Sequence, residues 1–165
     1  MRLLAQIKLS DICEYDIENK LPKKGYLYFF QAPIVDNYVY TFGKVVYSEN
    51  ENVKRRKLNL PDDGLEVNLY VSKINKVNES LDDYTVYDFI SKGVNCETEK
   101  VNKIFGVYCT YNSDKDICNK VTNNYEILLR IGSILYGEGV TTFLIKPEDL
   151  KNLNFDNVIF DYDQT

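Results

Sequence analysis

The stretch LPKKGYLYFF, residues 21–30, decides the fold of this 165-residue chain. Proline and glycine in its first half break regular structure, and five aromatic or apolar residues then follow without interruption. Alternation along those residues places Tyr28 on one face of a strand, and Leu27 and Phe29 on the other. Because both faces are apolar, we predict a strand in the middle of a sheet.

Further strand patterns lie on both sides of this stretch. An apolar run over residues 3–9 opens the chain, and a longer one over residues 39–47 contains Gly43, which we interpret as a bulge or bend. Residues 65–71 alternate between apolar and polar, as a half-buried strand does. In the last third of the chain, strands are expected over residues 107–111, 126–131, 141–145 and 158–162.

Helix patterns are fewer and shorter. Residues 81–91 have helical spacing after a capping residue, Ser80, and a second helix is expected over residues 98–105, ending at Gly106. Pro147, followed by acidic residues, is typical of a single helical turn. About seven or eight short strands, two or three helices and no regular βα alternation predict an antiparallel-rich α+β fold.

Composition limits the classes of protein to which the chain could belong. A chain of this length folds as one domain, here residues 1–165, burying roughly 70% of its unfolded surface. The formal net charge of -5 opposes non-specific nucleic-acid binding. No apolar run approaches the roughly 20 residues of a membrane helix, and the start lacks the order of a signal peptide. We therefore expect a cytoplasmic protein that binds neither nucleic acid nor membrane.

The chain contains no histidine, which removes Ser-His-Asp and Cys-His nucleophiles, mixed Cys/His metal sites and the commonest general base. No cofactor motif is present, so no cofactor is expected, and the balance is against an enzyme. The cysteines lack the paired spacing of a zinc site, and we expect reduced thiols rather than disulfides. These cysteines are Cys13, Cys96, Cys109 and Cys118.

Two loops resemble ligand motifs only in part. A phosphate loop needs a helix immediately after its glycines, but residues 137–139 precede a strand, so they are interpreted as a tight turn. The spacing from Asn112 through Asp114 to Asp116 resembles the start of a calcium loop. The required glycine is replaced by Ile117 and the final acid by an asparagine, which favours ordinary turn chemistry.

A pair of acids near the C-terminus allows two interpretations. Asp161 and Asp163 would lie on one face of a strand, where they could hold a divalent ion or divide acid and base roles. We favour a solvated strand edge, where charge discourages pairing. Exposed tyrosines beside an acidic loop could anchor a partner. The candidate partner-binding residues are thus Tyr108, Tyr111, Asp114, Asp116, Asp161 and Asp163.

Four segments in order, LLAQIKLSDI, LPKKGYLYFF, KIFGVYCTYNSD and the ending LLRIGSILYGEGVTTFLIKPEDLKNLNFDNVIFDYDQ, resemble the YwqG-like family of bacterial proteins of unknown function. The ending is the most specific part, with a glycine-rich turn, an apolar strand, an acidic turn at residues 148–150, an Asn-Phe step and a closing strand. This resemblance carries no established activity. Some family members are neighbours of toxin genes, which implies an immunity or partner-binding role.

The chain departs from the family pattern at three places. It has Phe105-Gly106 where the family has paired glycines, and Asn112 where glutamine is usual, so a ligand site that those residues shape in the family would differ here. Relatives usually precede the first strand with a Gly/Pro-rich segment. We therefore expect residues 3–9 to expose an edge or apolar groove beside residues 26–30, unless residues 11–20 fold back over it.

Two functions follow as hypotheses. The first is a non-catalytic protein-binding module, with an immunity or regulatory role, whose negative charge steers a basic bacterial partner. The alternative is a small carboxylate- or metal-dependent hydrolase that uses Asp161 and Asp163, or Asp114 and Asp116. The oligomeric state stays open.

Overall fold

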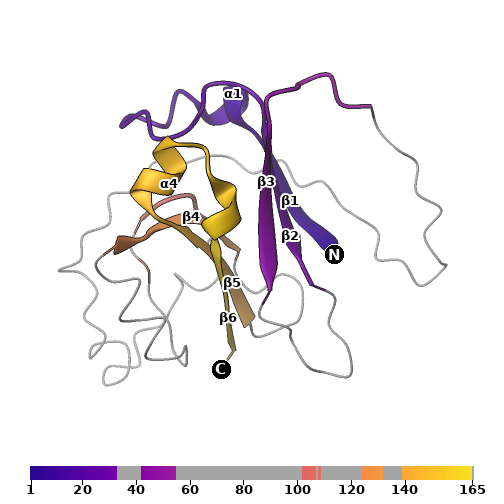
Figure 1. Ribbon diagram of the computed structural model, residues 1–165, viewed down its shortest axis with the longest axis vertical. Coiled ribbons are helices and arrows are strands. Elements are labelled where there is room, and N and C mark those ends of the chain that lie inside the picture. The colour runs from indigo at the N-terminus through magenta and orange to yellow at the C-terminus, as the bar shows by residue number, and fades with distance from the viewer. Residues whose placement is uncertain (33–41, 55–101, 107, 109–123, 132–138, 165) are drawn as a thin grey trace.

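The computed structural model describes residues 1–32, 42–54, 102–106, 108, 124–131 and 139–164, and these form two antiparallel sheets (Figure 1). The first sheet has the order β1-β2-β3 and the second the order β4-β5-β6. Two short helices and one 3-10 turn accompany them, so the α+β prediction is confirmed. The elements are β1 Arg2–Lys8, α1 Leu9–Ile12, β2 Tyr26–Gln31, β3 Gly43–Ser48, β4 Glu126–Ile131, β5 Gly139–Ile145, α4 Pro147–Lys151, η3 Phe155–Asn157 and β6 Ile159–Gln164.

The strand β2 is central in its sheet, as its sequence predicts. It pairs with β1 on one side and with β3 on the other. Leu27 and Phe29 are fully buried, whereas Tyr26, Tyr28 and Phe30 on the opposite face are half-buried. One face of the strand thus belongs to the core, and the second is partly open.

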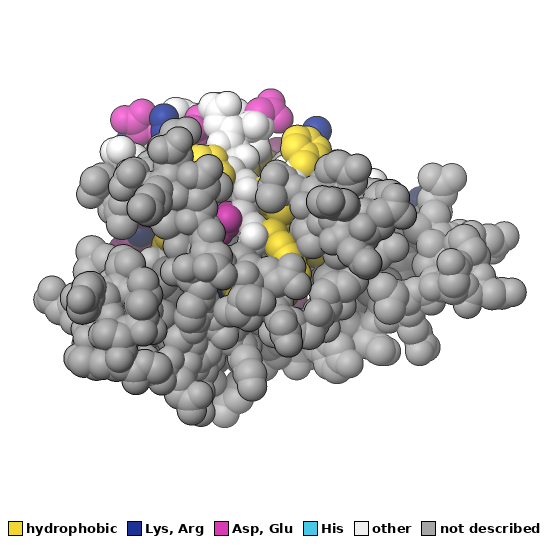
Figure 2. Space-filling model, turned by 90° about the horizontal axis from the view of Figure 1, so that it is seen from below, with side chains coloured by type: hydrophobic (Ala, Val, Ile, Leu, Met, Phe, Trp, Pro, Cys, Tyr) yellow, Lys and Arg dark blue, Asp and Glu magenta, His cyan; other side chains and the backbone are white. Residues whose placement is uncertain are grey.

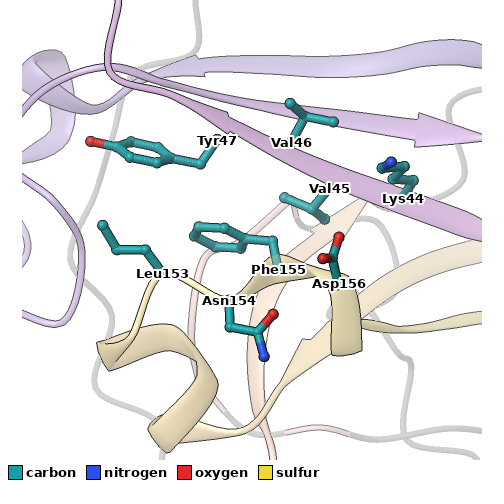
Figure 3. Close-up of a pocket in the computed structure, with 8 residues that line it drawn as sticks. All are labelled: Lys44, Val45, Val46, Tyr47, Leu153, Asn154, Phe155 and Asp156. Atoms are coloured by element: carbon teal, nitrogen blue, oxygen red, sulfur yellow. The ribbon is translucent and has the colours of Figure 1, made fainter.

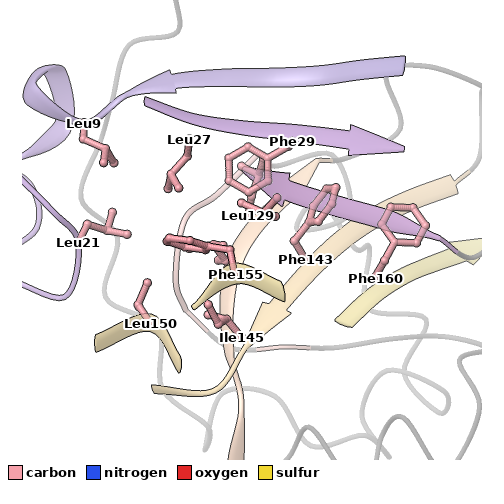
Figure 4. Close-up of a cluster of buried hydrophobic side chains, with 12 residues drawn as sticks. Leu9, Leu21, Leu27, Phe29, Leu129, Phe143, Ile145, Leu150, Phe155 and Phe160 are labelled. Carbon is pink, nitrogen blue, oxygen red and sulfur yellow. The ribbon is translucent and has the colours of Figure 1, made fainter. Parts of the chain in front are cut away.

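The core lies between the two sheets and receives side chains from both (Figure 4). Phe143 of β5 lies between two other aromatic rings, edge-on to Phe29 at 5.1 Å between centroids and to Phe160 at 5.2 Å. Such T-shaped pairs are worth about 0.5–1.5 kcal/mol beyond the area they bury. Seen from below, charged and hydrophobic side chains of the described residues are both visible, with most of the acidic ones toward the top of the view (Figure 2).

Gly43 allows the two sheets to approach each other closely, and the prediction of a bulge at this residue is wrong. The register of β2 with β3 runs without a shift from Tyr26 opposite Ser48 to Gln31 opposite Gly43. A Cβ added to Gly43 would lie only 2.2 Å from a ring carbon of Phe160. The glycine is therefore required because β6 packs against the first residue of β3.

The helix expected over residues 98–105 is absent from the described part, residues 102–105. Lys103 instead forms an antiparallel bridge with Arg130 of β4, with N–H to O distances of 3.0 and 2.8 Å. Phe105 then donates its N–H to the carbonyl of Ile127 at 2.9 Å. Pairing with β4 is favoured over a helix because it packs Phe105 and its neighbour Ile104 against the core.

The C-terminal third follows the prediction closely. The strands β4, β5 and β6 occupy the expected runs within one or two residues, and α4 begins with Pro147 at its first turn. Cys13 is a free thiol, as expected for this cysteine. In the described part, no helix is both long and apolar enough to cross a membrane. The predictions over residues 65–71 and 81–91, that over residues 107–111 apart from Tyr108, and the turn at residues 137 and 138 lie outside the described residues.

Candidate partner-binding site

Tyr108 and Asp161, two residues that the sequence singles out separately, lie in direct contact. The Tyr108 hydroxyl donates a hydrogen bond of 2.7 Å to Oδ2 of Asp161. The Asp161 residue is only 4% exposed, so the expectation of a solvated charge is wrong for it. A hydrogen bond to a carboxylate is stronger in a buried site than in water, because the local dielectric constant is lower.

The contact belongs to a polar row across the second sheet. Thr142 of β5 is opposite Arg130 of β4 on one side and opposite Asp161 of β6 on the other. All three are buried, and the two charged residues lie two strand spacings apart, roughly 10 Å. Because Arg130 and Asp161 carry opposite charges on one face of the sheet, each offsets part of the free-energy cost of burying the other. Sequence reasoning missed Arg130, although a basic residue inside the apolar run of β4 was a visible signal.

The other sequence candidates cannot be placed in this row. Asp163 continues β6, with its backbone opposite Val140. Tyr111, Asp114 and Asp116 lie outside the described residues. Within the described ranges, no three Asp, Glu or Cys residues are grouped closely enough to hold a metal ion.

A second charged group surrounds Lys20, in the loop before β2. Its Nζ lies 2.7 Å from a Glu18 carboxylate oxygen and 2.8 Å from one of Glu126, and 5.1 Å from the ring centroid of Phe105. Burial by itself would lower the pKa of Lys20, but the hydrogen bonds to Glu126 and Glu18 outweigh it and raise the pKa. The group joins the loop to β4 and keeps the lysine charged.

Phe105 and Gly106 occupy the place where the resemblance expects paired glycines. Their φ angles are 61° and 94°, both in the left-handed region that glycine adopts without strain. For phenylalanine this conformation costs on the order of 1–2 kcal/mol. Packing of the ring against the core and beneath Lys20 offsets that cost, which explains how this chain tolerates the departure.

A groove runs along β3, opposite the segment that joins α4 to β6 (Figure 3). Its volume is about 260 Å³, somewhat below the roughly 300–1,000 Å³ of pockets for small molecules. The two sides come from residues about a hundred positions apart in the chain. It is lined by Lys44, Val45, Val46 and Tyr47 of β3 and by Leu153, Asn154, Phe155 and Asp156.

Aromatic and aliphatic side chains form the floor of the groove. The ring of Phe155 points toward β3 and lies 6.0 Å from that of Tyr47. Leu153 is 44% exposed and presents apolar surface to solvent at the groove, whereas Val46, which is 37% exposed, points to the other face of β3. The recess therefore has a buried aromatic floor and one exposed aliphatic side chain, Leu153, on its wall.

Charged groups flank this apolar floor. Lys44 and Asp156 line the groove, and among the described residues neither forms an ion pair within 4.0 Å. At the other end, burial raises the pKa of Tyr47, and the carboxylates of Glu49 and Glu51 raise it further. The Tyr47 end therefore has a local negative potential.

Leu153 holds the wall of the groove in a strained conformation. It follows α4 with φ of 54°, while its N–H donates to Leu150 O at 3.1 Å and that of Asn154 to Asp149 O at 2.8 Å. These bonds form a Schellman motif, whose left-handed position usually holds glycine. Strained backbone conformations of this kind are often found at binding sites, and here the strained residue places a leucine side chain on the wall of the groove.

In the part of the chain that the structure describes, β1 is an outer strand, where an edge was expected at residues 3–9. The strand β1 ends the described sheet, and Leu3 is 46% exposed. Leu4 and Ile7, however, pack against the core between the sheets. The groove described above lies beside the other outer strand of the described sheet, β3.

Comparison with known proteins places the chain in a family without assigning it an activity. Residues 1–163 match the family described as a domain of unknown function, DUF1963. No curated protein matches the chain. Because the match spans nearly the whole sequence, the chain belongs to the DUF1963 family.

Proposed function

We propose that this DUF1963 member is a non-catalytic protein-binding module with an immunity or regulatory role. The observation that carries the proposal is the groove beside the outer strand β3, with its aromatic floor and the exposed Leu153 on its wall. Exposed apolar surface rimmed by polar groups is characteristic of protein interfaces. The groove offers a partner aromatic and aliphatic anchors between β3 and the segment that follows α4.

The charge of the chain supports a basic partner. Its formal net charge is -5, and Glu49, Glu51 and Asp156 are exposed near the groove. Acidic groups around an interface raise the association rate of a basic partner and disfavour acidic ones. Association by this route weakens as salt is added.

The carboxylate hydrolase has weaker support. The one candidate carboxylate whose side chain is described, Asp161, is 4% exposed and accepts a hydrogen bond from Tyr108. A buried carboxylate that already accepts a hydrogen bond is better explained as a structural part of the sheet than as a group that contacts a substrate.

A finer placement belongs with this proposal. We assign the chain to the YwqG-like members, because α4, η3 and β6 follow one another as their closing motif implies. We also treat the whole chain as one domain, since both sheets contribute to one core. The free thiol of Cys13 supports a cytoplasmic location, where thiols stay reduced.

The test is recovery of a defined partner and its reconstitution. Purified protein is immobilised on a resin and incubated at low salt with lysate of the bacterium that encodes it. An unrelated acidic protein of similar size, immobilised in the same way, is the control. The retained protein is identified, made separately and titrated by calorimetry. We expect a 1:1 complex with a basic protein whose affinity falls with added salt. If no protein is retained above the control, the proposal fails.

A further inference from the structure

We infer that the groove beside β3 is an arginine pocket, which receives one arginine side chain of the partner protein. The inference rests on the proposed function and names the residue by which the partner is recognised. Arginine is enriched among the residues that dominate the affinity of protein interfaces, because its flat guanidinium both stacks on aromatic rings and donates several hydrogen bonds. The groove offers both kinds of contact.

The groove has room for a single side chain. Val45 of β3 is only 2% exposed, and η3 packs against this strand, so the recess between them does not admit a longer segment of chain. Its volume is about 260 Å³, whereas an apolar cavity of about 150 Å³ holds one molecule of benzene. An arginine side chain is slightly larger than benzene and therefore fits, with its backbone at the mouth of the groove.

Aromatic and aliphatic surface is available for the flat group and for the stem that carries it. The Phe155 ring forms the floor, and the half-buried ring of Tyr47 lies 6.0 Å from it. A guanidinium within about 6 Å of a ring centroid is attracted to the face of the ring, and the attraction grows where water is excluded. Leu153, exposed on the wall, offers a contact for the aliphatic stem of the arginine.

Asn154 presents a hydrogen-bond acceptor to the groove, because the other end of its amide is fixed. Its Nδ2 donates to Oδ1 of Asp149 at 2.7 Å, and Asn157 donates to the same oxygen at 3.2 Å. An ionised carboxylate only accepts hydrogen bonds, so the amide nitrogen of Asn154 faces Asp149 and its oxygen faces away. Figure 3 shows this oxygen on the side nearer Phe155. Among the residues that the structure describes, none donates to it.

Asp156 supplies a second acceptor, which is charged. Its side chain lines the groove and is turned toward β3 (Figure 3). In the described part of the chain, this carboxylate forms neither a hydrogen bond nor an ion pair within 4.0 Å. A carboxylate and an amide oxygen both accept hydrogen bonds, so together they favour a cation with several N–H donors over an anion.

The charge around the groove also favours a cation, although one lysine opposes it. Glu49 and Glu51 are close enough to Tyr47 to raise the pKa of its hydroxyl, so this end of the groove has a negative potential. Lys44 lines the groove and carries the opposite charge, but it is exposed, and water and salt weaken its repulsion. The carboxylates of Asp156, Glu49 and Glu51 against one ammonium leave the groove with a net negative charge.

An NMR titration of the isotope-labelled full chain with capped amino acids tests the pocket directly. The probes are Nα-acetyl-arginine methylamide, the matching lysine compound, and the matching citrulline compound, which has the shape of arginine without its charge. The arginine probe should shift the amide signals of Tyr47 and residues 153–156, with a dissociation constant on the order of 1–10 mM. The other two probes should bind at least about threefold more weakly, since citrulline lacks the charge and lysine the planar group.

Two substitutions change the charge at the groove in opposite directions. Asp156→Asn should weaken binding of the arginine probe by about threefold or more, whereas Lys44→Met should strengthen it by about twofold. Glu148→Gln is the matched control, because it removes one negative charge from an exposed position on α4 that does not line the groove. It should leave the affinity within about 1.5-fold. Circular dichroism confirms that each variant is folded.

The outcomes separate this inference from the proposed function. A reconstituted partner whose affinity is unaffected by Asp156→Asn overturns the arginine pocket and leaves protein binding intact. The absence of a shift at about 50 mM arginine probe, or equal binding of the citrulline probe, also overturns it. Weaker binding with Lys44→Met would show that the groove prefers an anion, which contradicts the inference. Binding of the probe without any retained partner contradicts the proposed function, and with it a protein as the source of the arginine.

Discussion

Gly43→Ala should destabilise the protein, although alanine is the better residue for a strand by about 0.5–1 kcal/mol. The added Cβ would lie 2.2 Å from one ring carbon of Phe160, 2.7 Å from a second and 2.8 Å from a ring carbon of Phe143. Ordinary carbon contacts begin near 3.5 Å, so the Phe160 ring would need to move by roughly 1.3 Å, the difference between 3.5 and 2.2 Å.

The surroundings of the ring resist this movement. Phe160 packs on Phe143 at 5.2 Å, and Phe143 in turn packs on Phe29 at 5.1 Å, so displacement spreads through the aromatic contact between the sheets. Overpacking of a core costs about 1–3 kcal/mol, and the rigidity here favours the upper end. After the gain in propensity, we expect a net loss of about 2 kcal/mol, or roughly 4–8 °C in melting temperature.

Urea unfolding followed by circular dichroism measures the effect, with Phe160→Ala as the rescuing background. Alanine lacks the Cγ and the ring atoms that the new Cβ meets first, so the cost of Gly43→Ala should fall by at least about 1 kcal/mol there. A neutral or stabilising Gly43→Ala, or strictly additive effects in the double variant, would refute the argument that close approach to β6 requires the glycine.

The remaining predictions concern three other positions. Tyr108→Phe should cost about 1.5–3 kcal/mol, because the buried carboxylate of Asp161 loses a hydrogen bond; Tyr125→Phe, in the same apolar cluster, is the control, and equal effects in urea unfolding would contradict this. Leu153→Gly should stabilise by about 0.5–1 kcal/mol, as relief of left-handed strain exceeds the entropic cost of glycine, and a lower melting temperature would argue against strain. Burial raises the pKa of Tyr47, so the neutral phenol stabilises the folded state fully below the ordinary tyrosine pKa of 10.0, and this stabilisation is lost as pH rises through the higher folded value. The unfolding free energy of Tyr47→Phe should therefore fall less steeply above pH 10.0 than that of the wild type. Parallel curves of unfolding free energy against pH would exclude this contribution.

Much of the local structure could be predicted from the sequence because its causes are local. Continuous aromatic and apolar residues after a proline-glycine break indicate β2, and its position at the centre of the sheet follows from two apolar faces. The run EILLRI predicts β4 to the residue, and Pro147 with adjacent acids predicts α4. In these segments, side-chain alternation and backbone restriction act over a few neighbouring residues.

Local pattern fails where a distant contact overrides it. Residues 102–105 have acceptable helical spacing, but pairing with β4 satisfies their backbone and places Phe105 on the core. Gly43 looks like a bend in the sequence, whereas its requirement comes from Phe160, more than a hundred residues away. Neither outcome depends on the neighbouring residues, so neither could be derived from them.

What the sequence by itself determined is therefore the class of fold and the candidate residues one at a time, among them Tyr108 and Asp161. Tertiary structure decided that these two meet, that Arg130 joins their row through Thr142, and that Asp161 is buried. It also formed the groove from β3 and the loop at Leu153. The physical reason is that strand register and sheet packing are set by the whole core, and only they bring residues far apart in the chain to one surface.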